Sequence, residues 1–473
     1  MPDAHAFLEN LALVLCTAGL TTVISQKLRL PVVFGYLVAG MLVGPHVPIP
    51  LSADEEIVRT LSELGVILLM FALGLEFSFR KLLRVGATAG LIALAETSFM
   101  MWLGFSLGRL FGWTVIESVF AGAIVAISST TIIVKTFEER RLSGPFTELV
   151  LGILIFEDLI AILLLAALTA VAAGGELTVG GFALTAGRLA SFLAALIGIG
   201  LLVLPRAVRW LVRLNRPETT LIANIGICFA AALLADAFGY SVALGAFIAG
   251  SLVSESGEEK AVEQLVNPVR DVFVAIFFVS VGMLIDPEVI WRHRVPVLAM
   301  TLAVMVGKLA GVGLSSFLSG ATPPTAVRAG MSLTQIGEFS FIIAAVGLST
   351  QAIGDFMYPV AVAVSAITTL STPWLVRGAE PAAALVDRRL PRPVQTFVAL
   401  YGSWIERLRS APSEGGRPAA ERRLLRMLAL DVVLLAAVMV GGAIELERFT
   451  RLFVEWSGLS ETAGRATVLG MMV

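Results

Sequence analysis

Charged residues are scarce in this sequence. Asp, Glu, Lys and Arg make up 15% of the 473 residues, whereas soluble proteins contain about 25%. Hydrophobic residues make up 57%, and the mean hydropathy is +0.89. This composition excludes a large soluble core and predicts an all-α polytopic membrane protein with the lipid bilayer as its partner. The net charge of −2 gives no indication of a nucleic-acid partner.

Cysteine and histidine are rarer still. The two cysteines, Cys16 and Cys228, lie in apolar runs and form no CxxC or Cys/His pattern. Their spacing argues against a disulfide framework and against a zinc-type site. The three histidines, His5, His46 and His293, are far apart in the sequence, so we expect structural or surface roles for them.

The apolar runs predict thirteen spanning helices. A helix needs about 20 mainly apolar residues to cross a bilayer. The first run lacks a basic leading segment and a small-residue cleavage site, so we expect a retained span and not a signal peptide. The predicted limits are 6–25, 31–48, 60–77, 86–108, 114–136, 148–173, 187–205, 219–238, 241–254, 269–285, 295–318, 326–348 and 357–376.

Basic residues gather in alternate loops. The loops after odd-numbered spans contain Lys27, Arg29, Arg80, Lys81, Arg84, Lys135, Arg140, Arg141, Arg206, Arg209, Arg213, Arg216, Lys260 and Arg270. The loops after even-numbered spans contain few. The positive-inside rule therefore predicts that the odd loops are cytoplasmic and that the N-terminus lies outside a bacterial-type cell membrane.

The two halves of the chain resemble each other. Residues 31–43 (PVVFGYLVAGMLV) align without gaps on residues 241–253 (SVALGAFIAGSLV), a shift of 210 residues. Residues 70–74 and 121–130 find matches with a shift of 208 residues. Spans 2, 3 and 5 thus correspond to spans 9, 10 and 12, and this odd offset inverts the second copy in the membrane. Inverted repeats are typical of secondary transporters, and the alternative is chance similarity among Gly- and Ala-rich helices.

Polar residues interrupt two spans that the repeat relates. The fifth span contains Ser128, Ser129, Thr130 and Thr131, and the twelfth contains Ser332, Thr334, Gln335, Gly337, Glu338 and Ser340. Unwound backbone occurs at membrane depth only where it lines a cavity or is buried in protein. We predict two broken helices whose ends point at a common cation site. Alternatively, the hydroxyl groups bond to their own or a neighbouring helix.

The sixth span contains two adjacent acids, Glu157 and Asp158, and the eleventh contains Lys308. Neighbours on a helix point about 100° apart, so the two carboxylates cannot serve one site symmetrically. Because an unpaired buried ammonium is costly, we predict a pair between Glu157 and Lys308, with Asp158 facing the cavity. A purely structural ion pair is the alternative for Glu157 and Lys308.

Asp158 suggests a mechanism of exchange. Burial favours the neutral, protonated form of a carboxyl group, whereas a dehydrated alkali cation favours the ionised form. Proton and cation would then compete for the same two oxygen atoms. Exchange follows if the occupied site can face either side and the empty, charged site cannot. No cofactor is predicted besides the transported K⁺ or Na⁺ and H⁺.

The ordered motifs resemble the Kef-type branch of the monovalent cation:proton antiporters, the CPA2 family. The resemblance covers residues 6–376 and rests on PVVFGYLVAGMLVGP, FALGLEFSFRKL, AISSTTIIVKTFEER, LIFEDLIAILLL, ALGAFIAGSLVSES, FFVSVGMLID and SLTQIGEFSF. It implies the thirteen-helix sodium/proton-antiporter fold with inverted repeats and crossed discontinuous helices. It also implies a core domain and a dimerisation domain, and hence a homodimer.

The resemblance also implies the site. The family's site carboxylate matches Asp158, its first polar break matches residues 128–131, and its core lysine matches Lys308. We therefore expect a monovalent cation at Asp158, with Gln335 and Glu338 in support.

Two features depart from the family pattern. Kef potassium systems usually have Gln before the site Asp, and many electrogenic sodium exchangers have a second Asp, whereas this chain has Glu157. The ion and the stoichiometry are therefore open. Kef systems also carry a nucleotide-binding domain, but no GxGxxG follows a strand pattern here, so nucleotide control cannot be carried over.

The chain changes character after the antiporter unit predicted at residues 1–376. Residues 377–426 read as a basic cytoplasmic linker, and residues 427–473 are expected to contain an additional span, with an interfacial helix as the alternative. The sequence ends within hydrophobic residues, GRATVLGMMV, as a truncated chain would. We therefore expect that a C-terminal regulatory domain is missing.

Three other functions are alternatives for a sequence of this kind. A gated cation channel on the same fold would also need intramembrane acids, and it differs in requiring no counter-proton. An intramembrane aspartyl protease needs a GxGD motif, but the nearest string, AIGDF at Asp355, lacks the first glycine. A sensor or scaffold without transport is the third alternative, but it would have no need of the inverted repeat. We expect a transporter and not an enzyme.

Overall fold

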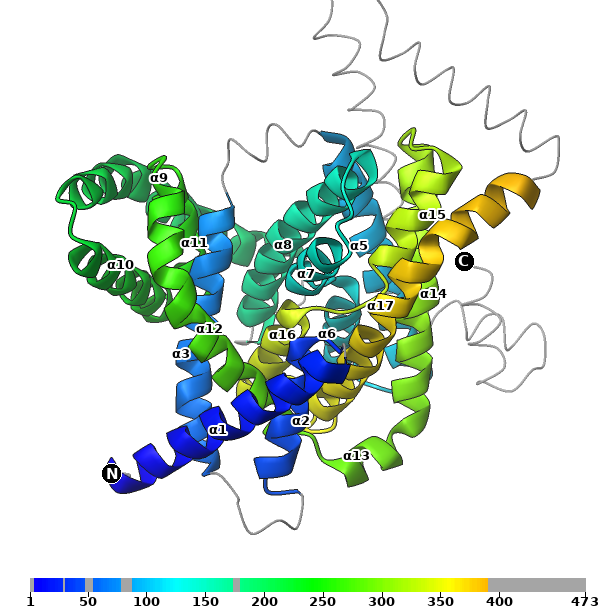
Figure 1. The fold of residues 1–473 in the computed structure, drawn as a ribbon, viewed down its shortest axis with the longest axis horizontal. Coiled ribbons are helices and arrows are strands. Elements are labelled where there is room, and N and C mark those ends of the chain that lie inside the picture. The colour runs from blue at the N-terminus through cyan, green and yellow to red at the C-terminus, as the bar shows by residue number, and fades with distance from the viewer. Residues whose placement is uncertain (1–3, 29, 47–53, 78–86, 173–178, 390–473) are drawn as a thin grey trace, which may run out of the picture. The chain divides into compact units, whose positions relative to one another are not determined.

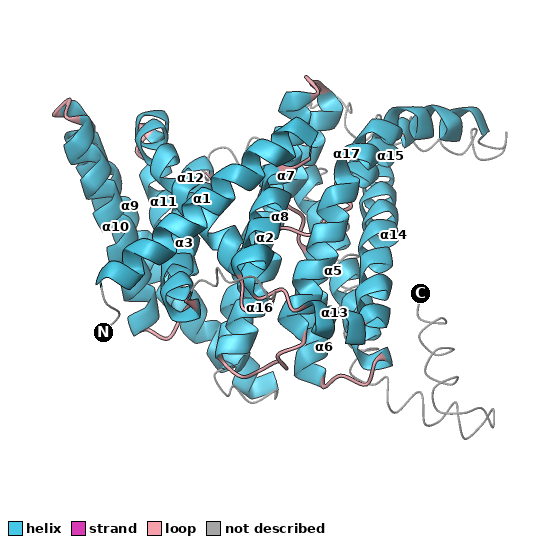
Figure 2. Ribbon diagram, turned by 60° about the horizontal axis from the view of Figure 1, so that its bottom comes forward, coloured by secondary structure: helices cyan, strands magenta, loops and turns pink. Residues whose placement is uncertain are grey.

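The computed structural model describes residues 4–28, 30–46, 54–77, 87–172 and 179–389. Within these ranges every regular element is a helix, and no strand occurs (Figures 1 and 2). The helices are α1 (Ala4–Leu28), α2 (Val32–Val43), α3 (Glu55–Glu76), α5 (Ala87–Leu110), α6 (Val115–Ala126), α7 (Thr130–Glu139), α8 (Pro145–Ala172), α9 (Val179–Arg213), α10 (Pro217–Ala237), α11 (Val242–Ser254), α12 (Glu259–Met283), α13 (Pro287–Arg292), α14 (Arg294–Leu318), α15 (Pro323–Ser332), α16 (Glu338–Ser349) and α17 (Met357–Arg389).

The described helices match the predicted spans. Ten stretches are long and apolar enough to cross a membrane, and three shorter apolar helices accompany them: Val32–Val43, Val242–Ser254 and Glu338–Ser349. Each of the thirteen predicted spans coincides with a helix or, at 114–136 and 326–348, with two helices separated by a break. The chain is thus a multi-pass membrane protein, as the sparse charge predicts.

The last described helix is longer than predicted. α17 continues past the expected end at residue 376 to Arg389. Val376, Ala379 and Ala383 are buried, and their spacing places them on one face of the helix, so packing continues the helix into the polar segment. The rest of the predicted linker and residues 427–473 lie outside the described residues.

The chain divides into two compact units. Unit 1 comprises residues 1–84, 161–294 and 341–366, and unit 2 comprises residues 85–160, 295–340 and 367–473. A hydrophobic cluster in unit 1 joins residues of α1, α2, α3 and α12, including Val14, Ala39 and Val279. A second cluster, in unit 2, includes Ile92 of α5 and Ile153 of α8.

Glycine contacts in unit 1 reproduce the sequence repeat. A Cβ added to Gly282 of α12 would lie 3.0 Å from the Cα of Gly40 of α2, and one added to Gly74 of α3 would lie 3.0 Å from the Cα of Gly250 of α11. The alignment pairs Gly40 with Gly250 and Gly74 with Gly282. The two close helix crossings are therefore equivalent positions of the two copies, and both need glycine because the backbones touch.

Candidate ion-binding site

Two broken helices cross at their breaks, and both breaks lie in unit 2. α6 ends at Ala126 and α7 begins at Thr130, while α15 ends at Ser332 and α16 begins at Glu338. The N–H of Gly337, in the second break, donates a hydrogen bond of 2.9 Å to the carbonyl oxygen of Ile127 in the first. Each break thus satisfies backbone groups of the other, as unwound backbone at membrane depth requires.

Asp158 lies beside the first break. It belongs to α8 and is 9% exposed. The hydroxyl group of Thr130, the first residue of α7, donates a hydrogen bond of 2.9 Å to Asp158 Oδ2. Asp158 therefore lies beside the N-terminus of α7, where the partial positive charge of a helix is found.

Glu338 accepts hydrogen bonds from two other hydroxyl groups of this segment, those of Ser129 and Thr131. Ser129 Oγ donates to Glu338 Oε2 at 2.8 Å, and Thr131 Oγ1 donates to Glu338 Oε1 at 3.1 Å. Glu338 is the first residue of α16 and is 3% exposed. The predicted polar run therefore serves two carboxyl groups, because Thr130 is directed to Asp158 while its two neighbours are directed to Glu338.

Glu157 contacts the backbone of the first break. Its Oε2 accepts a hydrogen bond of 2.7 Å from the N–H of Ser128. Its buried Oε1 has no hydrogen-bond partner within the described part of the chain. Gln335, in the second break, donates from Nε2 to the carbonyl oxygen of Ser129 at 3.4 Å, and its Oε1 is likewise buried without a partner there.

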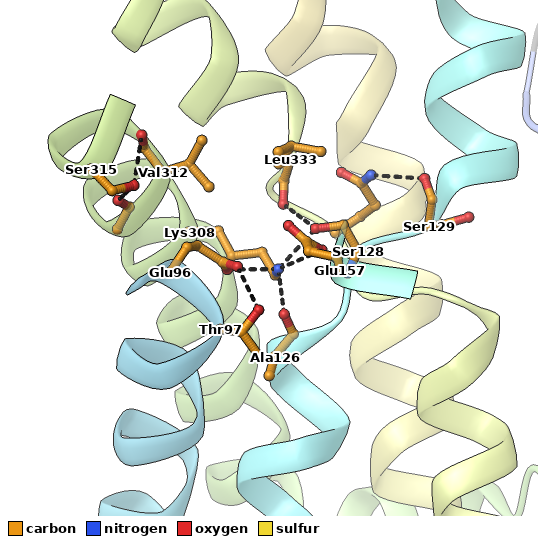
Figure 3. A network of polar contacts seen from close by, with 12 residues as sticks. Glu96, Thr97, Ala126, Ser128, Ser129, Glu157, Lys308, Val312, Ser315 and Leu333 are labelled. Carbon is orange, nitrogen blue, oxygen red and sulfur yellow. Dashed lines mark hydrogen bonds and ion pairs between the residues drawn. The ribbon is translucent and has the colours of Figure 1, made fainter. Parts of the chain in front are cut away.

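Lys308 has a carboxylate partner that the sequence interpretation missed. Its Nζ lies 2.8 Å from Glu96 Oε1 on α5 and 3.6 Å from Glu157 Oε2, and all three side chains are fully buried (Figure 3). The predicted contact with Glu157 is present, but the hydrogen-bonded partner is Glu96. The sequence does contain an indication of this partner, because Glu96 is the single acid within the apolar string LIALAETSFMM.

The structure gathers all nine predicted residues within unit 2. They are Ser128, Ser129, Thr130, Thr131, Glu157, Asp158, Lys308, Gln335 and Glu338. Hydroxyl, carboxylate and carbonyl oxygens converge on the crossed breaks, and such oxygens are the ligands that hard cations prefer. The arrangement can therefore bind a small cation or a proton.

Glu157→Gln is expected to retain exchange. The glutamine side-chain oxygen can still accept the Ser128 N–H, so the break keeps its conformation, while one negative charge disappears. We expect altered stability or stoichiometry, measured as thermal midpoint and as charge moved per cation in proteoliposomes. Complete loss of transport would contradict this prediction and make Glu157 itself a carrier.

Crossed discontinuous helices with polar residues at their breaks are typical of secondary transporters. The sodium/hydrogen exchanger transmembrane family model matches residues 12–378. The chain therefore belongs to the sodium/hydrogen exchanger family, and the predicted family and fold class are confirmed.

Several known proteins are similar to this chain. The cation/proton antiporter YbaL of Escherichia coli is 35% identical over 351 residues, which cover 71% of this chain and 62% of YbaL. K(+) efflux antiporter 5 of Arabidopsis thaliana is 31% identical, covering 78% of this chain and 66% of that protein. The K(+)/H(+) antiporter subunit KhtU of Bacillus subtilis is 31% identical, covering 73% and 87%. The chain thus spans slightly less than two thirds of the length of the first two relatives.

A solved structure shares the fold. The sodium proton antiporter MjNhaP1 from Methanocaldococcus jannaschii superposes with a TM-score of 0.62 at 17% identity, covering 80% of this chain and 97% of that one. At this identity the likeness concerns the fold alone.

Proposed function

We propose that the chain exchanges a monovalent cation for protons by alternating access, with cation and proton competing for Asp158. The observation that carries the proposal is the place of Asp158, which is buried in a spanning helix and bonded to Thr130 at the crossing of two broken helices. The names of two relatives support it, because YbaL is named a cation/proton antiporter and KhtU a K(+)/H(+) antiporter subunit.

The competition explains coupling without a further component. With a proton or a cation bound, the carboxyl group of Asp158 carries no net charge into the membrane interior. The empty carboxylate carries a full charge, which is costly to move through a low-dielectric region. The occupied site therefore changes its exposure from one side of the membrane to the other more readily than the empty site. Cation transport in one direction is consequently coupled to proton transport in the other.

The transported cation is K⁺ or Na⁺ in this proposal. One relative is named a K(+) efflux antiporter and another, GerN of Bacillus cereus, a Na(+)/H(+)-K(+) antiporter. The oxygen donors at the crossing, from carboxyl, hydroxyl and amide groups, suit either ion. The cation and the proton are substrates, and the proposal includes no resident cofactor.

The proposal places the protein in a bacterial-type cell membrane as a homodimer with its N-terminus outside. The alternation of basic loops supports this orientation. Electrophoretic or cross-linking measurement of the purified protein in lipid would test the dimer independently of transport.

Everted membrane vesicles test the exchange itself. Vesicles that contain the protein are acidified inside, and K⁺ or Na⁺ is then added with the membrane potential clamped. We expect the added cation to collapse the pH gradient. Cation flux of equal rate without proton movement would overturn the proposal in favour of a channel.

A further inference from the structure

The ammonium group of Lys308 has three hydrogen-bond acceptors at short distance. Its Nζ lies 2.8 Å from Glu96 Oε1, 2.7 Å from the carbonyl oxygen of Ala126 and 2.8 Å from Ser128 Oγ (Figure 3). The Ser128 hydroxyl directs its own hydrogen to the carbonyl oxygen of Leu333 at 3.4 Å, so it accepts from Lys308. An ammonium has three N–H donors and a neutral amine has two. Only the protonated form of Lys308 supplies a hydrogen to every acceptor.

Glu96 is the counter-ion of this ammonium. With three N–H groups donated, Lys308 has none left for Glu157, whose Oε2 lies 3.6 Å away and takes the N–H of Ser128 instead. Glu96 is fully buried on α5, and its second oxygen, Oε2, accepts from Thr97 Oγ1 at 3.4 Å. Separating or neutralising one member of a fully buried ion pair is strongly unfavourable. Each partner therefore holds the other in place.

The contact with Ala126 gives this ion pair a mechanical role. Ala126 is the last residue of α6, and the final carbonyl groups of a helix lack partners within the helix and carry partial negative charge. Lys308 donates a hydrogen bond to this C-terminal carbonyl oxygen of α6 and another to the hydroxyl of Ser128. The N–H of Ser128 in turn donates to Glu157. The conformation of the first break thus depends on where Glu96 holds Lys308.

We propose that Glu96 is a positioning residue for the exchange proposed above, on which this inference rests. It holds Lys308 against the carbonyl oxygen of Ala126 and the hydroxyl of Ser128, and it thereby fixes the conformation of the first break.

Four variants in proteoliposomes test this role: Glu96→Gln, Glu96→Asp, Lys308→Gln and the double variant Glu96→Gln/Lys308→Gln. The exchange rate and the reconstituted amount of protein are measured in each. We expect each single neutral variant to lose more than about tenfold in rate, because each leaves one buried charge without its partner. We expect the double variant to be several-fold faster than Glu96→Gln, because it leaves no buried charge without its partner. Glu96→Asp, which keeps the charge, should exceed Glu96→Gln in rate.

Two results would overturn the inference. One is a double variant that reconstitutes as well as Glu96→Gln but is no faster, because the two residues would then not act through each other. The other is equal rates in Glu96→Asp and Glu96→Gln, because the charge of residue 96 would then be irrelevant whether or not the double variant folds. Glu288→Gln is the matched control, since Glu288 is 70% exposed on α13. Absence of exchange in the natural protein would instead refute the proposed function.

Discussion

Asp158→Asn is expected to reduce cation-driven proton movement to the level of vesicles without the protein. An amide cannot bind and release a proton near neutral pH, and it offers a cation no negative charge. The variant therefore loses both proton binding and cation binding at residue 158. The geometry of the site should survive, because Asn and Asp have the same shape and the hydroxyl of Thr130, now 2.9 Å from Oδ2, can donate to the amide oxygen. The measurement is the change in intravesicular pH after addition of K⁺ or Na⁺.

Asp271→Asn provides the matched control. Asp271 belongs to α12, is 66% exposed and pairs with Arg270, so its replacement changes charge outside the candidate site. We expect transport close to that of the natural protein. Undiminished exchange in Asp158→Asn, with expression and size-exclusion profile equal to the control, would refute the site assignment.

Much of the fold could be predicted because the bilayer imposes simple rules. Its thickness sets the length of an apolar helix, so hydropathy located the spans. The repeat then identified the two spans that should be broken, since polarity recurs at equivalent places in both. The break between α6 and α7 lies at residues 127–129, within the string AISSTT that suggested it.

The partners within the site could not be predicted to the same extent. Sequence order says that Thr130 and Thr131 are adjacent, but only the start of α7 determines that the first is directed to Asp158 and the second to Glu338. Glu96 was missed for a related reason. The role of Glu96 depends on the packing of α14 against α5, which brings Lys308 into contact with it. The two residues are more than 200 positions apart in the sequence.

The contacts of Lys308 also distinguish Glu157 from Glu96. Glu96 and Glu157 lie near one ammonium, and ionising both would leave net negative charge in a fully buried cluster. Because Glu96 takes a direct bond from Lys308, Glu157 is the less compensated of the two. The Glu157→Gln variant therefore probes the position at which the sequence leaves the ion and the stoichiometry open.

Gly337→Ala is expected to impair transport about tenfold or more by separating the two breaks. A Cβ at residue 337 would lie 2.6 Å from the carbonyl oxygen of Ser128 and 2.8 Å from the Cα of Ser129, whereas ordinary contacts begin near 3.4 Å. Both neighbours are backbone atoms, so one break must move, and the hydrogen bond from Gly337 to Ile127 is strained or lost. Overpacking of this kind costs about 1–3 kcal/mol, and shifts of about 1 Å at a functional site have large effects on rate. The exchange rate and the thermal midpoint in detergent measure the two consequences.

Gly226→Ala separates this effect from a general intolerance of substitution. Gly226 lies in the spanning helix α10, and a Cβ there would meet nothing within 4 Å. The added methyl group should also favour the helix, because alanine has a higher helix propensity than glycine. We therefore expect natural transport and equal or higher stability in Gly226→Ala. Equal exchange rates and thermal midpoints in the two variants would contradict this prediction. The close approach of the two breaks would then not be required to hold Ser129 and Thr130 against their carboxyl groups.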